Sequence, residues 1–407
     1  MRIRIALLLA GLMVVMNVYF TANAQATGIG FKDVKPDHWA GKAIEASVGR
    51  GYFKGYADGT FKPNATVTRA EFAALLARVA KGEADADAGS AASFSDVAGH
   101  WSEAEVKRAV ALGFVQPSDY PDGFKPNTPI TRFEIAKWMA SGLAEAHSDY
   151  KQALEDTKTA VIPVKEYFNP GIPESKSPYI AVALGAKLLS GYPDGSFGME
   201  QRATRAETAT ILLNYENASL KKADQFLGLR ELRQVGTERT NLETISPFTT
   251  GNTSFNNVVG KTYTFKNNAG SLKLHNYIVV DTEDFKDINS IYAPLFVDES
   301  DYVERIDKPG NYRVFMQVTI YPKANEFDLG HYMNGAVSPL LGSGRVGNVK
   351  PEKYGYLTLP NFEAKKFFRT NNTGNGLIIW VKSNIAPNSR WDEFKTDDDS
   401  YVIIQKK

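Results

Sequence analysis

Three arginines of this chain occupy the same local setting. Each follows a threonine directly and precedes a glutamate by two positions, in Thr68-Arg69-Ala70-Glu71, Thr131-Arg132-Phe133-Glu134 and Thr204-Arg205-Ala206-Glu207. A threonine with a glutamate three residues later is a capping box, which marks a helix start. Anions are favoured at a helix N-terminus, and a guanidinium can donate two hydrogen bonds to one carboxylate. The pattern therefore predicts three anion contacts, and the alternative for each arginine is a structural ion pair with a nearby acid.

Other short patterns recur upstream of these arginines. An aspartate motif is followed by a His-Trp pair, in Phe31-Lys32-Asp33-Val34 with His38-Trp39 and in Phe94-Ser95-Asp96-Val97 with His100-Trp101. A glycine-containing turn then follows, at residues 55–61, 120–124 and 191–197. In the third copy Tyr167-Phe168-Asn169-Pro170 stands in place of the aspartate motif, and Tyr179 lies near the tryptophan position. Repetition of this kind fixes an architecture, so the chain is predicted to contain three related units.

Each repeat is predicted to fold as a helix, a loop and a second helix. In the first repeat, Trp39, Ala43, Ile44 and Val48 recur at helical spacing. Asp58-Gly59 marks a tight turn, because glycine adopts positive φ at little cost. The second helix would begin at the capping box.

These motifs resemble the S-layer homology (SLH) module in triplicate, with repeats at 27–80, 94–145 and 160–217, the third degenerate in its first half. The resemblance implies an all-α fold, in which three modules form a pseudo-threefold bundle with one central helix from each. It also implies that grooves between neighbouring modules bind a secondary cell-wall polysaccharide, which often bears ketal-pyruvate groups. An exported protein would thereby be anchored to the cell wall without a covalent bond.

The resemblance gives the repeated residues polysaccharide-binding roles. Arg69, Arg132 and Arg205 would bind the pyruvate carboxylate. The remaining contacts would be Trp39 and Trp101 against sugar faces, Asp33 and Asp96 to sugar hydroxyls, and Gly55 and Gly191 where the ligand approaches the backbone. The alternatives are core packing for the tryptophans and helix capping for the aspartates. The groove containing Arg69 is predicted to be the most intact, because Phe133 adjoins Arg132 and the third repeat lacks the His-Trp pair.

The chain begins with a secretory signal pattern. Arg2 and Arg4 precede an apolar run from Ile5 to Phe20, and small residues follow, so residues 1–26 are predicted to be cleaved. The run is shorter than the roughly 20 residues of a spanning helix, and no later segment is predicted to insert into a membrane. The 407 residues include no cysteine and carry a net charge of +1, which implies no bulk attraction to nucleic acid. The combination fits the surface of a Gram-positive bacterium.

The second half of the chain changes its pattern. Residues 218–256 are predicted to be a helical extension and a linker. Residues 257–407 are predicted to be an all-β domain, a sandwich, because Tyr312 to Ile320 alternates apolar and polar residues apart from Phe315. Residues 261–266 and 272–280 flank a turn sequence and predict a hairpin.

The sequence contains no pattern that specifies an enzyme, a cofactor or a metal site. The five histidines are scattered, and there is no nucleophile elbow or phosphate loop. Glu299, Asp301 and Glu304 could supply a glycosidase pair, and Asp397-Asp398-Asp399 could hold calcium, but solvated loops are the alternative for both. The function predicted is a wall-anchored binding or structural protein. The alternatives are a wall-anchored carbohydrate-active hydrolase with its site in the β domain and a self-assembling S-layer subunit.

Overall fold

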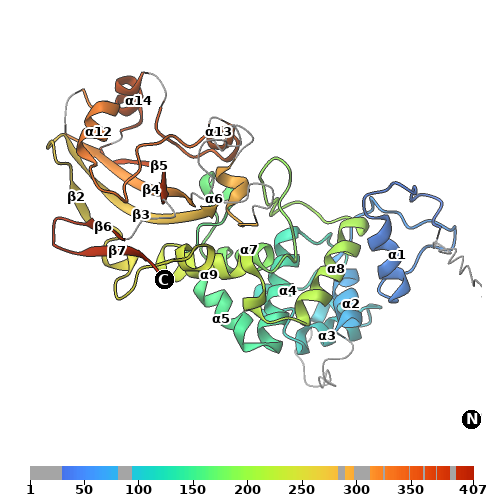
Figure 1. The fold of residues 1–407 in the computed structure, drawn as a ribbon. Coiled ribbons are helices and arrows are strands. Elements are labelled where there is room, and N and C mark those ends of the chain that lie inside the picture. Colours follow the sequence, from blue (N-terminus) through green and yellow to red (C-terminus); the bar gives the residue numbers. More distant parts are fainter. Residues whose placement is uncertain are drawn as a thin grey trace, which may run out of the picture.

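The fold is taken from a computed structural model, which describes residues 30–80, 94–282, 289–297, 312–323, 326–347, 349–360, 363–372, 374–385 and 391–407. The predicted signal peptide and the candidate acids Glu299, Asp301 and Glu304 lie outside the described residues. A helical region and a C-terminal region with most of the strands lie side by side (Figure 1). No helix within the described ranges is long and apolar enough to cross a bilayer.

The helical region consists of the three repeats and the segment that follows them. Its helices are α1 (Gly41–Gly49), α2 (Arg69–Val79), α3 (Glu103–Ala111), α4 (Arg132–Ala146), α5 (Ser148–Asp156), α6 (Lys165–Phe168), α7 (Ser177–Gly185), α8 (Arg205–Ser219), α9 (Leu227–Glu238) and α10 (Leu242–Ile245). All three predicted capping boxes are present, at the starts of α2, α4 and α8. In each, the threonine side chain accepts from the glutamate N–H and the glutamate carboxylate accepts from the threonine N–H.

The three repeats contact one another in a ring. Backbone bridges join Thr68 to Pro129, Thr131 to Arg202 and Thr66 to Thr204, so each repeat pairs with the other two. The first helix of one repeat packs on the second helix of another, as α3 on α2, α7 on α4 and α1 on α8. The backbone N–H groups at the starts of α2, α4 and α8 thus donate to carbonyls of the next repeat, as Arg69 N does to Thr128 O at 2.9 Å. The first backbone N–H groups of a helix have no acceptor within that helix. Here the neighbouring repeat supplies the acceptors.

The helical extension predicted at the start of residues 218–256 is present as α9 (Leu227–Glu238), and the segment after it, predicted to be a linker, is folded structure. Helix α9 packs on α7 and on α5, and a Cβ on Gly236 would lie 1.9 Å from the carbonyl oxygen of Asp156 at the end of α5. Asn241 then forms two hydrogen bonds with Val279, which lies in the C-terminal region. Strand β1 (Phe248–Thr249) pairs with the last strand of the chain. Threonine, asparagine and glycine predict a linker, but here their polar groups have buried partners.

The C-terminal region contains two antiparallel sheets. One has the order β2 (Thr262–Thr264), β3 (Gly270–Asp281), β4 (Tyr312–Pro322) and β5 (Leu377–Ile385), and the other has the order β1, β7 (Tyr401–Lys406) and β6 (Trp391–Lys395). The predicted hairpin is present as the β2–β3 pair. The prediction of an all-β domain is wrong, because the region also contains α11 (Ala293–Phe296), α12 (Leu329–Gly335), α13 (Val349–Tyr354) and α14 (Ala364–Asn371).

Both faces of the four-stranded sheet are buried. One face, with Val314, Met316 and Val381, shares a core with the three-stranded sheet. The other face belongs to the core of the helical region, where Phe315 stacks on Phe296 at 4.4 Å and Trp380 lies against Phe168 of the third repeat. Phe315 is the residue that interrupts the predicted alternation, and the second buried face is the physical reason. The helical and C-terminal regions therefore share one continuous core.

A buried carboxyl lies at the junction of the two regions. Glu231 of α9 is fully buried and accepts hydrogen bonds from Asn241 Nδ2 at 2.8 Å, Ser290 Oγ at 2.7 Å and Ile291 N at 3.0 Å. Burial raises the pKa of Glu231 from 4.5 to about 7, although the three hydrogen bonds favour the charged form. Because the folded state binds this proton more tightly, the contribution of Glu231 to stability is present below pH 4.5 and is lost as the pH rises towards 7.

We expect Glu231→Gln to remove this pH dependence. Between pH 5 and pH 8 the free energy of unfolding of the wild type should fall, relative to the variant, by up to about 3 kcal/mol, since one pKa unit corresponds to about 1.4 kcal/mol. Urea unfolding at both pH values measures the difference. Glu238→Gln, at a half-buried carboxyl of the same helix, is the control and should parallel the wild type. If the stability of Glu231→Gln changed with pH as that of the wild type does, Glu231 would not be the source of this pH dependence.

Candidate functional site

Each of the three predicted anion contacts is bonded to the turn of the next repeat. Arg69 Nη1 donates to Phe124 O at 2.9 Å, Arg132 Nε to Phe197 O at 3.0 Å and Arg205 Nε to Phe61 O at 2.8 Å. A tyrosine of the same turn lies against each guanidinium, Tyr120, Tyr192 and Tyr56 in that order. Each guanidinium thus links two repeats by hydrogen bonds. These contacts agree with the alternative of a structural role.

Arg132 and Arg205 are the most buried of the three arginines. Their exposed fractions are 4% and 9%, and each donates a second hydrogen bond to a backbone carbonyl, of Ser190 at 2.6 Å and of Lys54 at 3.1 Å. Burial lowers the pKa of the Arg205 guanidinium from its ordinary value. Two donors of each side chain are therefore bonded to backbone carbonyls of a neighbouring repeat, and the role of these arginines as polysaccharide contacts stays a prediction.

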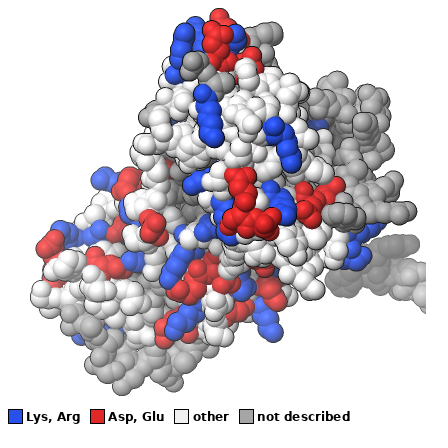
Figure 2. Space-filling view, turned by 90° about the vertical axis from the view of Figure 1, so that its left-hand side faces the viewer, with Lys and Arg blue, Asp and Glu red and all other residues white. Residues whose placement is uncertain are grey.

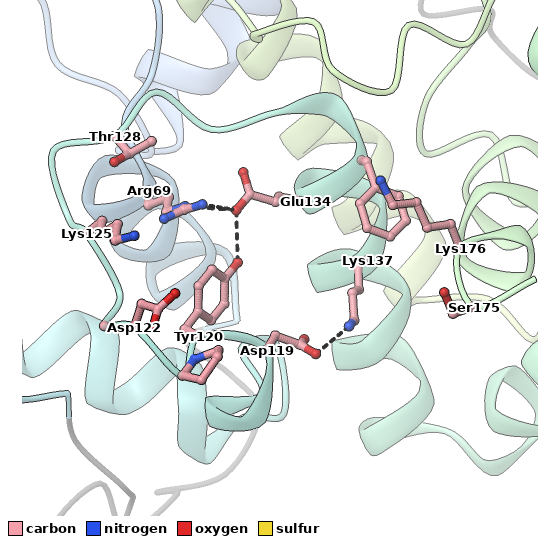
Figure 3. A pocket seen from close by; sticks show the side chains of 13 residues that line it. Arg69, Asp119, Tyr120, Asp122, Lys125, Thr128, Glu134, Lys137, Ser175 and Lys176 are labelled. Atoms are coloured by element: carbon pink, nitrogen blue, oxygen red, sulfur yellow. Dashed lines mark hydrogen bonds and ion pairs between the residues drawn. The ribbon is translucent and has the colours of Figure 1, made fainter. Parts of the chain in front are cut away.

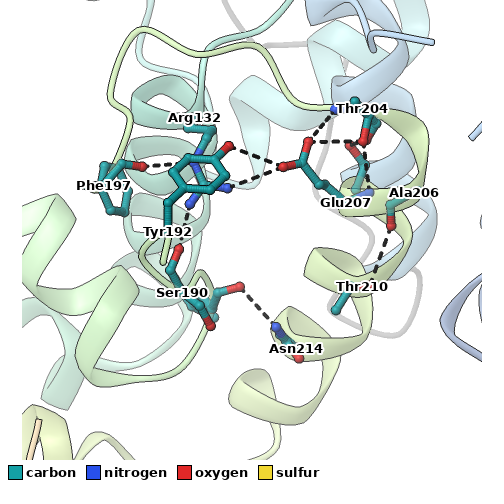
Figure 4. Close-up of polar contacts among 11 residues, drawn as sticks. Arg132, Ser190, Tyr192, Phe197, Thr204, Ala206, Glu207, Thr210 and Asn214 are labelled. Carbon is teal, nitrogen blue, oxygen red and sulfur yellow. Dashed lines mark hydrogen bonds and ion pairs between the residues drawn. The ribbon is translucent and has the colours of Figure 1, made fainter. Parts of the chain in front are cut away.

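The capping glutamates also act between repeats. Glu207 uses Oε2 to cap Thr204, while its Oε1 accepts from Tyr192 Oη at 3.2 Å and lies 4.0 Å from Arg132 Nη1 (Figure 4). Glu134 does the same more tightly, at 2.7 Å from Arg69 Nη2 and 3.1 Å from Tyr120 Oη. Burial together with the charge of Glu134 raises the pKa of Tyr120, so its hydroxyl stays protonated as a donor. Each of these two glutamates thereby caps its own helix and also contacts the arginine of the preceding repeat.

The aspartates hold the turns and cap no helix. Asp33 accepts from Phe61 N at 2.8 Å and Lys62 N at 2.7 Å, and Asp96 accepts from Phe124 N at 3.0 Å and Lys125 N at 2.7 Å. Lys62 and Lys125 have positive φ, of 56° and 54°. A paired carboxylate on two successive N–H groups stabilises a backbone conformation that lysine seldom adopts.

In the third repeat, Glu166 is the carboxylate that holds the turn. The sequence pattern did not predict it. It accepts from Phe197 N at 2.9 Å and Gly198 N at 2.7 Å. The motif counterpart is therefore Val164-Lys165-Glu166, three residues before the segment assigned from sequence. The spacing between the acid and the turn could have identified Glu166. It is 28 residues for Asp33 and 31 residues for Glu166. The first half of the third repeat is altered in residue type but keeps this contact.

The predicted tryptophans are exposed and do not pack in the core. Trp39 and Trp101 have exposed fractions of 68% and 59%, and each lies beside the preceding histidine. Each tryptophan precedes its helix by two residues. The residue at that place before α7 is Ser175, not Tyr179, which lies within α7 and contacts Phe133.

The predicted glycines have packing reasons for lacking a side chain. A Cβ on Gly55 would lie 2.2 Å from the ring of Phe31, and one on Gly191 would lie 3.2 Å from Ser196 O. Gly55 is therefore required by its own repeat. Nothing in its surroundings requires a ligand to approach the backbone there.

A cavity of about 630 Å³ lies beside Arg69, where all three repeats meet (Figure 3). Its lining is Arg69, Asp119, Tyr120, Pro121, Asp122, Gly123, Lys125, Thr128, Phe133, Glu134, Lys137, Ser175 and Lys176. We call it the Arg69 groove. Of the three predicted anion contacts, Arg69 is the one in this cavity, with 16% of its side chain exposed.

Three lysines line the Arg69 groove, and two of them are in ion pairs. Arg69 is paired with Glu134, and Lys137 is paired with Asp119 at 2.6 Å. Lys125 forms no ion pair with any residue of the described ranges, and Lys176 contacts Glu200 at 3.2 Å and the ring of Phe133. The three lysines were not among the predicted site residues, because they come from three separate segments that only the packing of repeats brings together.

Two acids line a cavity in the described part of the C-terminal region. A cavity of about 700 Å³ there is lined by Glu352 and Glu363, with Arg345, Tyr356 and Phe367 among the other residues. Glu363 is paired with Lys366 at 3.1 Å and its side chain is largely exposed. Asp398, of the predicted calcium loop, instead pairs with Lys261 at 2.9 Å. No group of three or more metal-ligating side chains occurs among the residues that the structure describes.

Comparison with known families identifies the repeats. The S-layer homology domain matches residues 30–73, 93–136 and 170–209, so the chain carries three S-layer homology domains. These are anchoring modules, not catalytic ones, and the matched ranges end at residue 209.

Similar curated proteins share this part of the chain. The "Cell surface glycoprotein 1" of Acetivibrio thermocellus is 40% identical over 26% of this chain and 5% of its own length. The "Cellulosome-anchoring protein" of the same organism is 38% identical over 26% and 24%, and the "S-layer protein sap" of Bacillus anthracis is 30% identical over 55% and 24%. The chain thus spans a quarter or less of the length of each of these relatives. The domains and relatives indicate a secreted protein of the cell surface.

Proposed function

We propose that the three S-layer homology domains anchor this protein non-covalently to the bacterial cell wall by binding a secondary cell-wall polysaccharide. The C-terminal region would then be displayed from the wall in a binding or structural role. The observation that carries the proposal is the Arg69 groove, a cavity of about 630 Å³ with four cationic side chains where the three repeats meet. The anchoring role named for one relative supports it.

An acidic sugar suits the chemistry of the groove. The ammonium group of Lys125 is available to a carboxylate such as that of a pyruvate ketal, and Lys176 would exchange its contact with the exposed Glu200 for the same carboxylate. Arg69 contributes positive potential, although its own donors are bonded to Glu134 and Phe124. Arg69 and Lys176 are partly buried at the edge of the cavity, where a cation attracts an anion more strongly than on an open surface. Binding should therefore weaken as the salt concentration rises.

The exposed tryptophans suit the neutral part of a polysaccharide. Trp39 precedes α1, which packs on α8, and Trp101 precedes α3, which packs on α2. Neither tryptophan lines the Arg69 groove. Exposed indole rings offer an apolar face to a sugar ring and an N–H to its hydroxyls. The Arg69 groove has Ser175 and Lys176 at the corresponding place and would take the charged group instead.

Cosedimentation with purified cell walls tests the proposal. The full chain should sediment with walls, and this should be lost when the secondary polysaccharide is chemically removed while the peptidoglycan remains. Removal of acidic substituents alone should weaken binding and abolish its salt dependence. Binding that is unchanged after the polysaccharide has been removed would refute anchoring through that polymer.

A further inference from the structure

A second cavity with cationic walls lies at the tip of the C-terminal region, beside α14. It has a volume of about 290 Å³ and is lined by Pro322, Lys323, Phe327, Lys365, Phe368, Arg369 and Asn372. Figure 2 shows basic and acidic side chains gathered at this upper end of the molecule. The cavity lies in a different region from the S-layer homology domains, and no function described above uses it.

The cavity has a rigid apolar floor. Phe327 and Phe368 are 3% and 2% exposed, and their rings meet edge to face at 4.8 Å. Phe327 also stacks on Phe265, which continues β2. The floor therefore belongs to the core between the two sheets, and it fixes the positions from which the charged side chains extend.

The walls supply three cations from two elements. Lys323 follows β4, where its backbone N–H donates to Ala269 O at 2.8 Å. Lys365 and Arg369 lie one helical turn apart on the same face of α14. Lys365 is paired with Glu326 at 2.7 Å, whereas neither Lys323 nor Arg369 forms an ion pair within the described ranges. No acidic residue lines the cavity.

The remaining polar group in the wall is also a donor. The Oδ1 atom of Asn372 accepts from Gly374 N at 3.2 Å, which leaves its NH₂ group free to donate. Every polar side chain of the lining thus presents hydrogen-bond donors. Guanidinium and ammonium groups without carboxylate partners suit an oxyanion.

We infer that this cavity, the α14 site, binds an oxyanion group, phosphate or carboxylate, carried on a unit no larger than one sugar. The size follows from the volume, which lies at the lower end of the roughly 300–1,000 Å³ of small-molecule sites. The oxyanion would lie between Lys323 and Arg369, with the NH₂ group of Asn372 and the ammonium group of Lys365 as further donors around the ligand. The ligand could come from the wall polymer or from free sugar phosphates.

Titration calorimetry of the full chain tests the α14 site. Glucose 6-phosphate and glucuronate are the probes, and glucose is the neutral probe. At least one anionic probe should bind saturably, and the double variant Lys323→Gln/Arg369→Gln should weaken it at least tenfold. The control is Lys366→Gln, which changes a lysine of the same helix that pairs with Glu363 outside the cavity. All these side chains are exposed, so folding should be retained.

Two outcomes would overturn the α14 site. One is the absence of saturable binding by both anionic probes, and the other is an equal loss of affinity in the Lys366→Gln control. The source of the ligand is decided by repeating the titration with soluble wall polysaccharide in a Lys125→Glu/Lys176→Glu background. Residual binding that Arg369→Gln removes indicates the polymer, and no residual binding indicates a free sugar. Because the small probes need no wall, this test is independent of the anchoring proposal.

Discussion

Arg132→Ala and Arg205→Ala should each destabilise the protein by about 3 kcal/mol, since each removes a buried charge and leaves two carbonyl acceptors unpaired. The affected carbonyls are those of Phe197 and Ser190 for Arg132, and of Phe61 and Lys54 for Arg205. In both cases the lost bonds join different repeats, so the helical region should open as a unit. Urea unfolding followed by circular dichroism gives the free energy.

Arg50→Ala is the matched control for this prediction. Arg50 also joins two repeats, through Glu216 at 2.9 Å, but 46% of its side chain is exposed. Exposed ion pairs contribute about 0–1 kcal/mol, so the control should unfold almost as the wild type does. If Arg205→Ala instead kept its stability and lost only wall binding, the arginine would be a ligand contact as the sequence predicts, and the structural role would be wrong.

Reversing the open charges of the Arg69 groove should abolish most wall binding. Lys125→Glu/Lys176→Glu replaces two attractive contacts to an acidic sugar with two repulsive ones, and each is expected to weaken binding about tenfold, or about 100-fold together. Neither lysine is buried, so the fold should be retained. Cosedimentation with purified walls over a range of protein concentrations gives the affinity.

The control is a second double variant that changes the net charge of the protein by the same amount as the groove variant does. Lys151→Glu/Lys221→Glu alters two exposed lysines of the helical region that do not line the groove, and it should bind walls as the wild type does. Unchanged binding by the groove variant, together with loss of binding in Trp39→Ala/Trp101→Ala, would move the site to the tryptophan-bearing grooves. Among correctly folded variants, Arg69→Ala should weaken wall binding more than Arg205→Ala, because Arg69 lies in the cavity.

Helix starts and hairpins were predictable because their causes are local. The capping boxes at Thr68, Thr131 and Thr204 need only a threonine and a glutamate three residues apart, and all three are present. The β2–β3 hairpin likewise follows from a turn sequence between two strand patterns. The S-layer homology domains were identifiable for the same reason, since their motifs are short and repeated.

Contacts between regions were not predictable from local patterns. Residues 235–256 have the composition of a linker, yet Asn241 is bonded to Val279 and to Glu231, whose carboxylate also accepts from Ser290 and Ile291. Helices α12 to α14 lie between the strands of the C-terminal region. Each is too short to give a clear helical pattern in the sequence, so they were not predicted. Phe315 did leave a signal, as the apolar residue at a position where alternation predicts a polar one.

The sequence by itself determined where the repeats lie, which residues begin their helices and which class of domain they form. The tertiary structure alone decided what the side chains at those helix starts contact. An arginine after a capping threonine can donate to a ligand or to a neighbouring carbonyl, and its identity does not choose between them. The ring of repeats places the carbonyls of Phe61, Phe124 and Phe197 within reach and brings Lys125, Lys137 and Lys176 around one cavity. Partners more than 50 residues apart are set by packing, which no local spacing encodes.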